Sequence, residues 1–116
     1  MDGFIDQLVR RYAARADAQV ALRTRVQEAL PEMVRVLVAE FGATRVILFG
    51  SMAGDTLWDE PDIDLLVAGI DPALLGRAAG RLFLLAPLLV DLVPIETGRR
   101  EVVERGLLAG IVLYSN

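Results

Sequence analysis

Two short apolar runs end or begin with residue types that are suited to binding a metal ion and phosphates. The run Val46–Phe49 stops at Gly50 and Ser51, and after ten further residues Asp62 and Asp64 open the next apolar run. Two carboxylates spaced by two on a strand leave the same face, where they repel each other unless a cation lies between them. Mg²⁺ suits this pattern, because it prefers oxygen ligands and combines carboxylates with phosphates and water.

The glycine and serine have the features of a phosphate-binding turn. Glycine at position 50 lets the backbone approach a phosphate, while the following amides and the Ser51 hydroxyl favour an anion. Asp91 lies in a third aliphatic run, where a carboxylate is costly unless it is paired, coordinated or exposed at a strand end. It could bind a second metal ion, accept a proton, or simply be an exposed edge residue. The combination of all these features favours a site for a metal and a triphosphate.

The composition limits the chemistry that the chain can perform. Its 116 residues suit one domain, and the 54% of hydrophobic residues argue against disorder. The sequence has no His, Cys or Lys, so catalysis would depend on carboxylates, hydroxyls, Arg and a hard metal rather than zinc. A net charge of −4 argues against direct nucleic-acid binding. With no signal peptide and no apolar run near the ~20 residues of a membrane span, we expect a cytoplasmic protein and no membrane partner.

The hydrophobic pattern predicts an α/β (α+β) domain, with a small mixed sheet of about four strands flanked by helices. Strands are expected at 45–49, 63–68, 88–93 and 111–114, and helices at about 4–40, 71–85 and 99–105. Pro31 predicts a break or kink near Leu30, and Gly42 and Gly106 are expected to end helices. Ser51 is a candidate cap for a short helix, and Trp58 is expected to pack rather than to stack on a base.

The N-terminal segment is expected to be an extension of the domain. Residues 1–30 form the predicted helical extension, and residues 31–116 form the predicted catalytic domain. An apolar stripe in the extension suits core packing, a partner surface or a homo-oligomer contact, and it comprises Phe4, Ile5, Leu8, Val9 and Tyr12. The arginines at positions 10, 11 and 15 are expected to form a solvated face.

These motifs resemble the minimal nucleotidyltransferase family of the DNA polymerase beta superfamily. LFGS at 48–51, ten intervening residues and DIDLLV at 62–67 reproduce its signature, Gly-Ser-x10-Asp-x-Asp. Asp91 in the run VDLV matches the third acid of that family. The resemblance covers residues from about Leu30 to Tyr114, and it implies the nucleotidyltransferase fold.

The resemblance also implies roles for the site residues. Asp62 and Asp64 would hold Mg²⁺, and Asp91 would complete a site for two ions or act as a base. Gly50 and Ser51 would hold the β- and γ-phosphates of ATP. The implied reaction transfers a nucleotidyl group to a hydroxyl and releases pyrophosphate. Members of this family often act as antitoxins that neutralise helical HEPN toxins by binding them or by adenylylating a toxin tyrosine, so a protein substrate is expected.

Departures from the family pattern leave a second hypothesis open. Where the family commonly has Gly-Ser-x-Ala-Arg-Gly, this chain has Gly54 at the arginine position and Asp55 after it, and Pro61 replaces the usual serine. Without lysine, cationic help for a triphosphate would come from Arg45, Arg99, Arg100 or a partner. The alternative to an active adenylyltransferase is therefore a binding module with a weak or inactive site, which neutralises its partner by complex formation alone.

Overall fold

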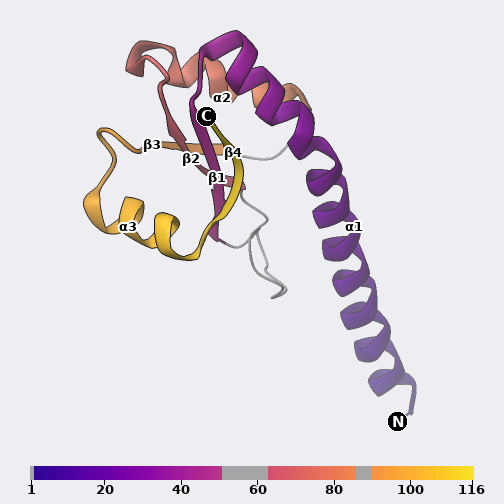
Figure 1. Cartoon of the computed structure of the whole chain (residues 1–116). Helices are drawn as coiled ribbons and strands as arrows, with labels where there is room; N and C mark the ends of the chain where they lie inside the picture. Colours follow the sequence, from indigo (N-terminus) through magenta and orange to yellow (C-terminus); the bar gives the residue numbers. More distant parts are fainter. Residues whose placement is uncertain (1, 51–62, 86–89) are drawn as a thin grey trace.

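A four-stranded sheet with helices on both faces forms the body of the protein, and one long helix extends well beyond it (Figure 1). The computed structural model describes residues 2–50, 63–85 and 90–116. The elements, in chain order, are α1 (Asp2–Phe41), β1 (Arg45–Phe49), β2 (Ile63–Ala68), the 3-10 turn η2 (Pro72–Leu74), α2 (Leu75–Leu85), β3 (Val90–Pro94), α3 (Arg100–Ala109) and β4 (Ile111–Ser115). In the described part of the chain, no helix is long and apolar enough to cross a membrane.

The sheet is mixed, with the strand order β3-β2-β1-β4. Strand β1 is antiparallel to both of its neighbours, whereas β2 and β3 run parallel. The end of β1 and the beginnings of β2 and β3 therefore lie along the same edge of the sheet. We call this the acid edge, because Asp64 and Asp91 stand there as register partners next to Phe49, the last residue of β1.

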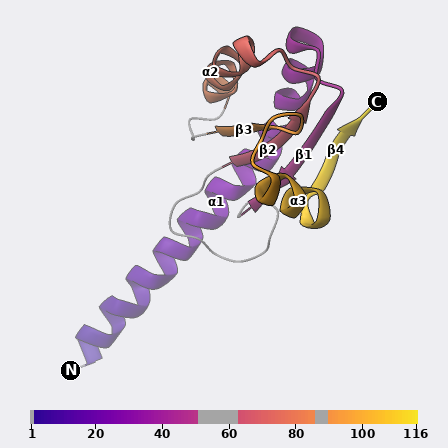
Figure 2. The same ribbon diagram turned by 90° about the vertical axis from the view of Figure 1, so that its left-hand side faces the viewer.

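The two faces of the sheet have separate apolar clusters. Helices α1 and α2 cover the face with the larger cluster, to which Met33, Leu37, Leu65 and Leu82 contribute fully buried side chains. Helix α3 covers the other face with a smaller cluster of Ile47, Leu66 and Val103 (Figure 2). Because side chains alternate along a strand, Asp64 and Asp91 share the α3 face with Leu66 and Val93.

Helix α1 runs without interruption from Asp2 to Phe41, with Pro31 inside it. Of the break or kink predicted near Leu30, the break does not occur, and the ribbon bends where the helix reaches the sheet (Figures 1 and 2). A proline removes one intrahelical hydrogen bond and commonly bends a helix in this way. Gly42 has a φ of 77° and ends α1 as predicted, because its N–H and that of Ala43 donate to the last carbonyls of the helix at 3.1 and 2.9 Å.

The short elements largely follow the sequence prediction. Strands β1 and β2 have the predicted bounds, and β4 is one residue longer than predicted. Asp71 caps η2 by accepting a hydrogen bond from the Ala73 N–H at 3.0 Å, and α2 ends at Leu85 as expected. The predicted roles of Ser51 and Trp58, and of residues 88 and 89 in the third strand, lie outside the described residues.

The prediction that Gly106 ends a helix is wrong. Helix α3 continues to Ala109, and the residue after its end is Gly110. Gly106 is buried, and a Cβ atom at this position would overlap the Leu66 side chain and lie 3.4 Å from the Phe49 ring. This glycine is therefore required by the close approach of α3 to the sheet rather than by a turn.

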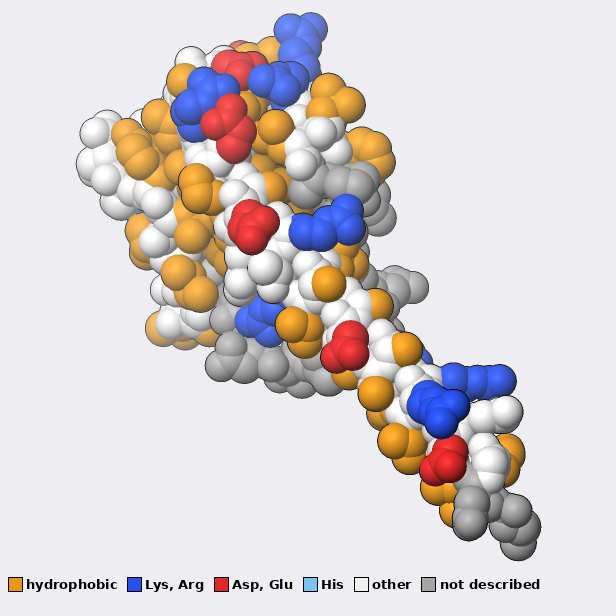
Figure 3. Space-filling view, turned by 90° about the vertical axis from the view of Figure 1, so that its right-hand side faces the viewer, with side chains coloured by type: hydrophobic (Ala, Val, Ile, Leu, Met, Phe, Trp, Pro, Cys, Tyr) orange, Lys and Arg blue, Asp and Glu red, His pale blue; other side chains and the backbone are white. Residues whose placement is uncertain are grey.

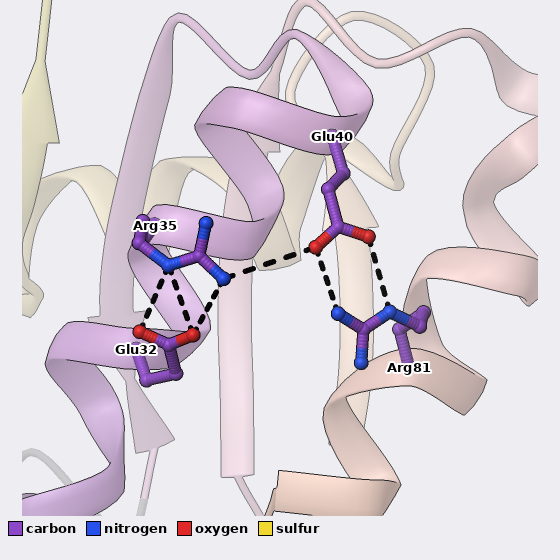
Figure 4. Close-up of polar contacts among 4 residues, drawn as sticks. All are labelled: Glu32, Arg35, Glu40 and Arg81. Atoms are coloured by element: carbon purple, nitrogen blue, oxygen red, sulfur yellow. Dashed lines mark hydrogen bonds and ion pairs between the residues drawn. The ribbon is translucent and has the colours of Figure 1, made fainter.

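A chain of ion pairs joins α1 to α2 on the face of the sheet that has the larger apolar cluster (Figure 4). The Arg81 guanidinium donates to both carboxylate oxygens of Glu40, at 3.1 and 2.7 Å. Arg35 makes hydrogen bonds to Glu32 at 2.5 to 2.9 Å and approaches Glu40 at 4.0 Å. The hydrogen bond from Arg81 lowers the pKa of Glu40, and that from Arg35 lowers the pKa of Glu32. The Arg81–Glu40 pair links the two helices, whereas the Arg35–Glu32 pair lies within α1, and exposed pairs of this kind add little to stability.

Candidate functional site

Gly50 and Asp64 meet at the acid edge, where β1 ends and β2 begins. Phe49 is the antiparallel partner of Asp64, and Gly50 follows it with a φ of 77°. A Cβ atom added at position 50 would overlap the Asp64 carboxylate and lie 3.2 Å from its Cγ atom. The glycine backbone and the carboxylate are thus in direct proximity, which was the arrangement that the sequence predicted for these two residues.

Asp64 and Asp91 are brought side by side by the parallel pairing of β2 and β3. They are direct register partners, and neighbouring strands lie about 4.8 Å apart. Asp64 is half-buried, whereas Asp91 is exposed on the edge strand β3. Because Asp91 is exposed, its carboxylate does not have the desolvation cost that a buried position would carry, and a ligand can reach it.

The α3 helix supports this pair from the side. Phe49 and Leu66 flank Asp64 on the same face of the sheet, and both lie close to Gly106. Helix α3 therefore packs against the same face of the sheet on which the two carboxylates lie. Gly106 is a positioning residue that the sequence analysis missed, although a glycine within a helical pattern is a signal of close packing.

The described acids suit a hard divalent cation. Asp64 and Asp91 offer carboxylate oxygens on one face at neighbouring positions, which is the ligand chemistry that Mg²⁺ prefers. Gly50 leaves room for the Asp64 carboxylate, because a side chain at position 50 would overlap it. No group of three potential metal ligands occurs within residues 2–50, 63–85 and 90–116. Ser51 and Asp62 lie outside these residues, so their places in the site stay predictions.

The arginines proposed to assist a triphosphate are not at the acid edge. Arg45 opens β1 opposite Ala68 and Ser115, four residues or about 13 Å along the strand from Phe49. Arg99 and Arg100 follow the turn after Pro94, near that same far edge, and Arg100 pairs with Glu104 at 2.9 Å. The sequence left the source of this charge open between these three arginines and a partner. Arg45 lies at the opposite end of its strand from the acids, and the backbone positions of Arg99 and Arg100 do not bring them to the acid edge, so the source stays a prediction.

Comparison with known proteins identifies structural relatives. No protein-family model matches the sequence, and no curated protein matches it. A solved structure of a protein assigned to the minimal nucleotidyltransferases shares 31% identity, covers 80% of this chain and 93% of its own, and has a TM-score of 0.57. A toxin–antitoxin structure with AMP-PNP gives 21% identity, 73% of each chain and a TM-score of 0.63. A complex of tri-AMPylated Shewanella oneidensis HEPN toxin with MNT antitoxin shares 19% identity. It covers 84% of this chain and 73% of its own, with a TM-score of 0.53.

The mixed sheet, its flanking helices and the acids at one edge define a nucleotidyltransferase fold. The sequence identity to the first of these relatives extends over most of both chains. The chain therefore belongs to the minimal nucleotidyltransferase family.

Proposed function

We propose that this protein is a Mg²⁺-dependent adenylyltransferase that transfers AMP from ATP to a hydroxyl of a partner protein, and that the partner is a HEPN toxin. The observation that carries the proposal is the proximity of Gly50 to Asp64, with Asp91 as its register partner on the next strand. Related folds support it, because one was solved with AMP-PNP and another with an AMPylated HEPN toxin. In this proposal the protein is the antitoxin of the pair.

The residues take roles that follow from their chemistry. Asp62, Asp64 and Asp91 would hold one or two Mg²⁺ ions, which would supply charge stabilisation to the phosphates. Gly50 and Ser51 would hold the β- and γ-phosphates of ATP. The acceptor oxygen forms a bond to the α-phosphorus as the bond to the bridging oxygen breaks, pyrophosphate leaves with that electron pair, and a carboxylate such as Asp91 accepts the hydroxyl proton.

The division of the chain follows the same proposal. Residues 1–30 would be an extension and residues 31–116 the nucleotidyltransferase domain. Val26 and Leu30 pack into the main core, so the last turns of this extension are joined to the domain. The exposed part of α1 before Val26 is then available for contacts with other chains.

One observation favours a second function, that of a binding module without turnover. The three arginines suggested to stabilise a triphosphate have backbone positions at or near the far edge of the sheet. Residues 51–62 contain no Arg or Lys either. Unless a partner supplies cations, nucleotide affinity would be weak, and neutralisation would result from complex formation.

The two functions are separated by a transfer assay with the purified toxin. The wild-type chain, ATP labelled at the α-phosphate and Mg²⁺ should give a labelled toxin, and Asp64→Asn should abolish the label while the complex still forms. Glu101→Gln, on the exposed first turn of α3, is the control that should keep full transfer. A wild-type chain that neutralises the toxin without labelling it would establish the binding module instead.

A further inference from the structure

The N-terminal half of α1 projects from the domain with a row of exposed apolar side chains. We call residues 2–25 the arm; it accounts for much of the 59 Å length of the molecule (Figures 1 and 3). Phe4 and Tyr12 are 68% and 81% exposed, and other exposed apolar side chains are Ile5, Leu8, Val9 and Val20. A hollow of about 420 Å³ runs beside them, lined by Leu8, Val9, Tyr12, Ala13 and Ala16.

This row continues the face that α1 buries in the domain. Val26, Leu30, Met33 and Leu37 are buried at spacings of four, three and four. Toward the N-terminus the same face carries Leu22, which lies four residues before Val26. From Leu22 onward, spacings of three and four pass through position 19, Arg15, Tyr12, Leu8 and Ile5. This spacing is that of a coiled-coil seam, in which apolar residues recur every 3.5 positions on average. The domain covers one half of the seam, and among residues 2–50, 63–85 and 90–116 no other element covers the other half, where Phe4, Leu8 and Tyr12 are exposed.

An exposed apolar seam of this kind is stabilised when another chain packs against it. Helices in water become marginal below roughly 12–15 residues, and longer ones owe most of their stability to packing of the apolar face. Contiguous exposed apolar surface on a small protein usually marks an interaction site. The occupant has to match both the apolar row and the arginines beside it.

We propose that the occupant is a second copy of this chain, and that the two arms pair as an antiparallel coiled coil. Residues whose numbers add up to 27 then face each other. Ile5 of one copy packs on Leu22 of the other, and Tyr12 packs on Arg15 of the other. Arg15 therefore lies on an aromatic ring, where a guanidinium is stabilised, instead of on another cation.

Charge selects this orientation over the parallel one. A parallel pair in register would place Arg15 of both copies against each other in the seam, which costs stability. The arm has five arginines and three aspartates, for a net charge of +2, whereas residues 26–116 have seven arginines and thirteen acids, for a net charge of −6. Parallel arms would set the two acidic domains side by side. Antiparallel arms place them at opposite ends and bring each basic arm toward the other copy's acidic domain.

The first experiment measures the mass in solution. The wild-type chain of 12.6 kDa should elute at twice its mass in size-exclusion chromatography with light scattering. Leu8→Asp should weaken the dimer about a hundredfold, because it puts a charge in a seam layer. The control is Leu108→Asp, a leucine of α3 that is 89% exposed and far from the arm, which should leave the dimer intact. A monomeric wild type, including one whose arm becomes covered only when the toxin is added, overturns the proposal.

The second experiment tests the orientation, and it benefits from the absence of native cysteines. Ile5→Cys and Leu22→Cys chains, mixed and oxidised, should form a disulfide-linked dimer that contains one of each. Neither variant alone should cross-link, because each cysteine would face a non-cysteine position. Within one helix these positions are about 25 Å apart, so no intrachain disulfide can form. Efficient cross-linking of Ile5→Cys alone would show parallel arms and contradict the proposal.

Discussion

Gly50 lies against the Asp64 carboxylate, so that the end of β1 and the start of β2 share one point of close contact. Two properties of glycine are used there at once. The φ of 77° is unfavourable for other residues, and the absent Cβ leaves the carboxylate its place. The backbone turn and the acid are therefore tied together, and a change at either position should disturb the other.

The first prediction separates these two properties of Gly50. Gly50→Ala should lower affinity for a Mg²⁺–ATP analogue at least tenfold, because the new methyl group would displace the Asp64 carboxylate. Gly42→Ala is the matched control: its φ is also 77°, but no atom lies within 4 Å of the added Cβ. It should cost about 1 kcal/mol of stability and leave nucleotide affinity unchanged. Calorimetric titration and thermal unfolding measure both quantities, and equal loss of binding in the two variants would contradict the prediction.

A second prediction concerns the different exposure of the two acids. Asp91→Asn should reduce AMP transfer by about a hundredfold or more, as expected when a metal ligand or proton acceptor is removed. Because Asp91 is exposed on an edge strand, the unfolding free energy should change by less than about 0.5 kcal/mol. Transfer rates and urea denaturation measured on the same preparation test both parts. Unchanged transfer with an intact fold would remove Asp91 from the site.

The sequence predicted the strands well, because short aliphatic runs bounded by Gly, Pro and Asp have few alternatives. It also brought Gly50, Asp64 and Asp91 together correctly, since the pattern implied adjacent strands. The predicted strand positions did not reveal whether Arg45 lies near Asp64 and Asp91. Arg45 belongs to the right strand but to its opposite end, which becomes clear only from the pairing.

Two features, one predicted wrongly and one left undecided, show what local patterns leave open. A glycine late in a helical pattern suits either a helix end or a close contact, and at Gly106 the tertiary contact with Leu66 decides. The stripe from Phe4 to Tyr12 has the same spacing whether it is buried or exposed. Its exposure follows from the continuation of α1 past the end of the sheet, which local sequence does not encode.

The third prediction uses the ion pair between Glu40 and Arg81. The pKa of Glu40 is lowered below its usual 4.5 in the folded protein, so its contribution to stability is present above that value and is lost as the pH falls through the folded pKa. Glu40→Gln should therefore lower the melting temperature modestly at pH 7, and the difference from wild type should shrink as the pH falls below 4.5 and through the folded pKa.

The control for that pair is Glu104→Gln, which removes an ion pair confined to α3, between Arg100 and Glu104, with side chains 88% and 59% exposed. This change should have almost no effect on the melting temperature at either pH, because the pair joins no separate elements. A Glu40→Gln deficit that persists unchanged at pH 3 would mean that packing, and not the charge, explains the effect.

The last prediction concerns Gly106 and the support of the acid edge. Alanine is favoured over glycine in a helix by about 1 kcal/mol, so Gly106→Ala would stabilise α3 if there were room for the added methyl group. The added methyl group, however, would overlap the fully buried Leu66, and overpacking costs about 1–3 kcal/mol. Net destabilisation by up to about 2 kcal/mol is expected.

In the matched control, Gly80→Ala in α2 meets no atom within 4 Å and should stabilise by up to about 1 kcal/mol. Urea denaturation of the two variants should therefore shift in opposite directions, and nucleotide affinity should fall only in Gly106→Ala, because α3 holds the face that carries Asp64 and Asp91. Stabilisation by both substitutions would show that α3 can move away from the sheet without cost.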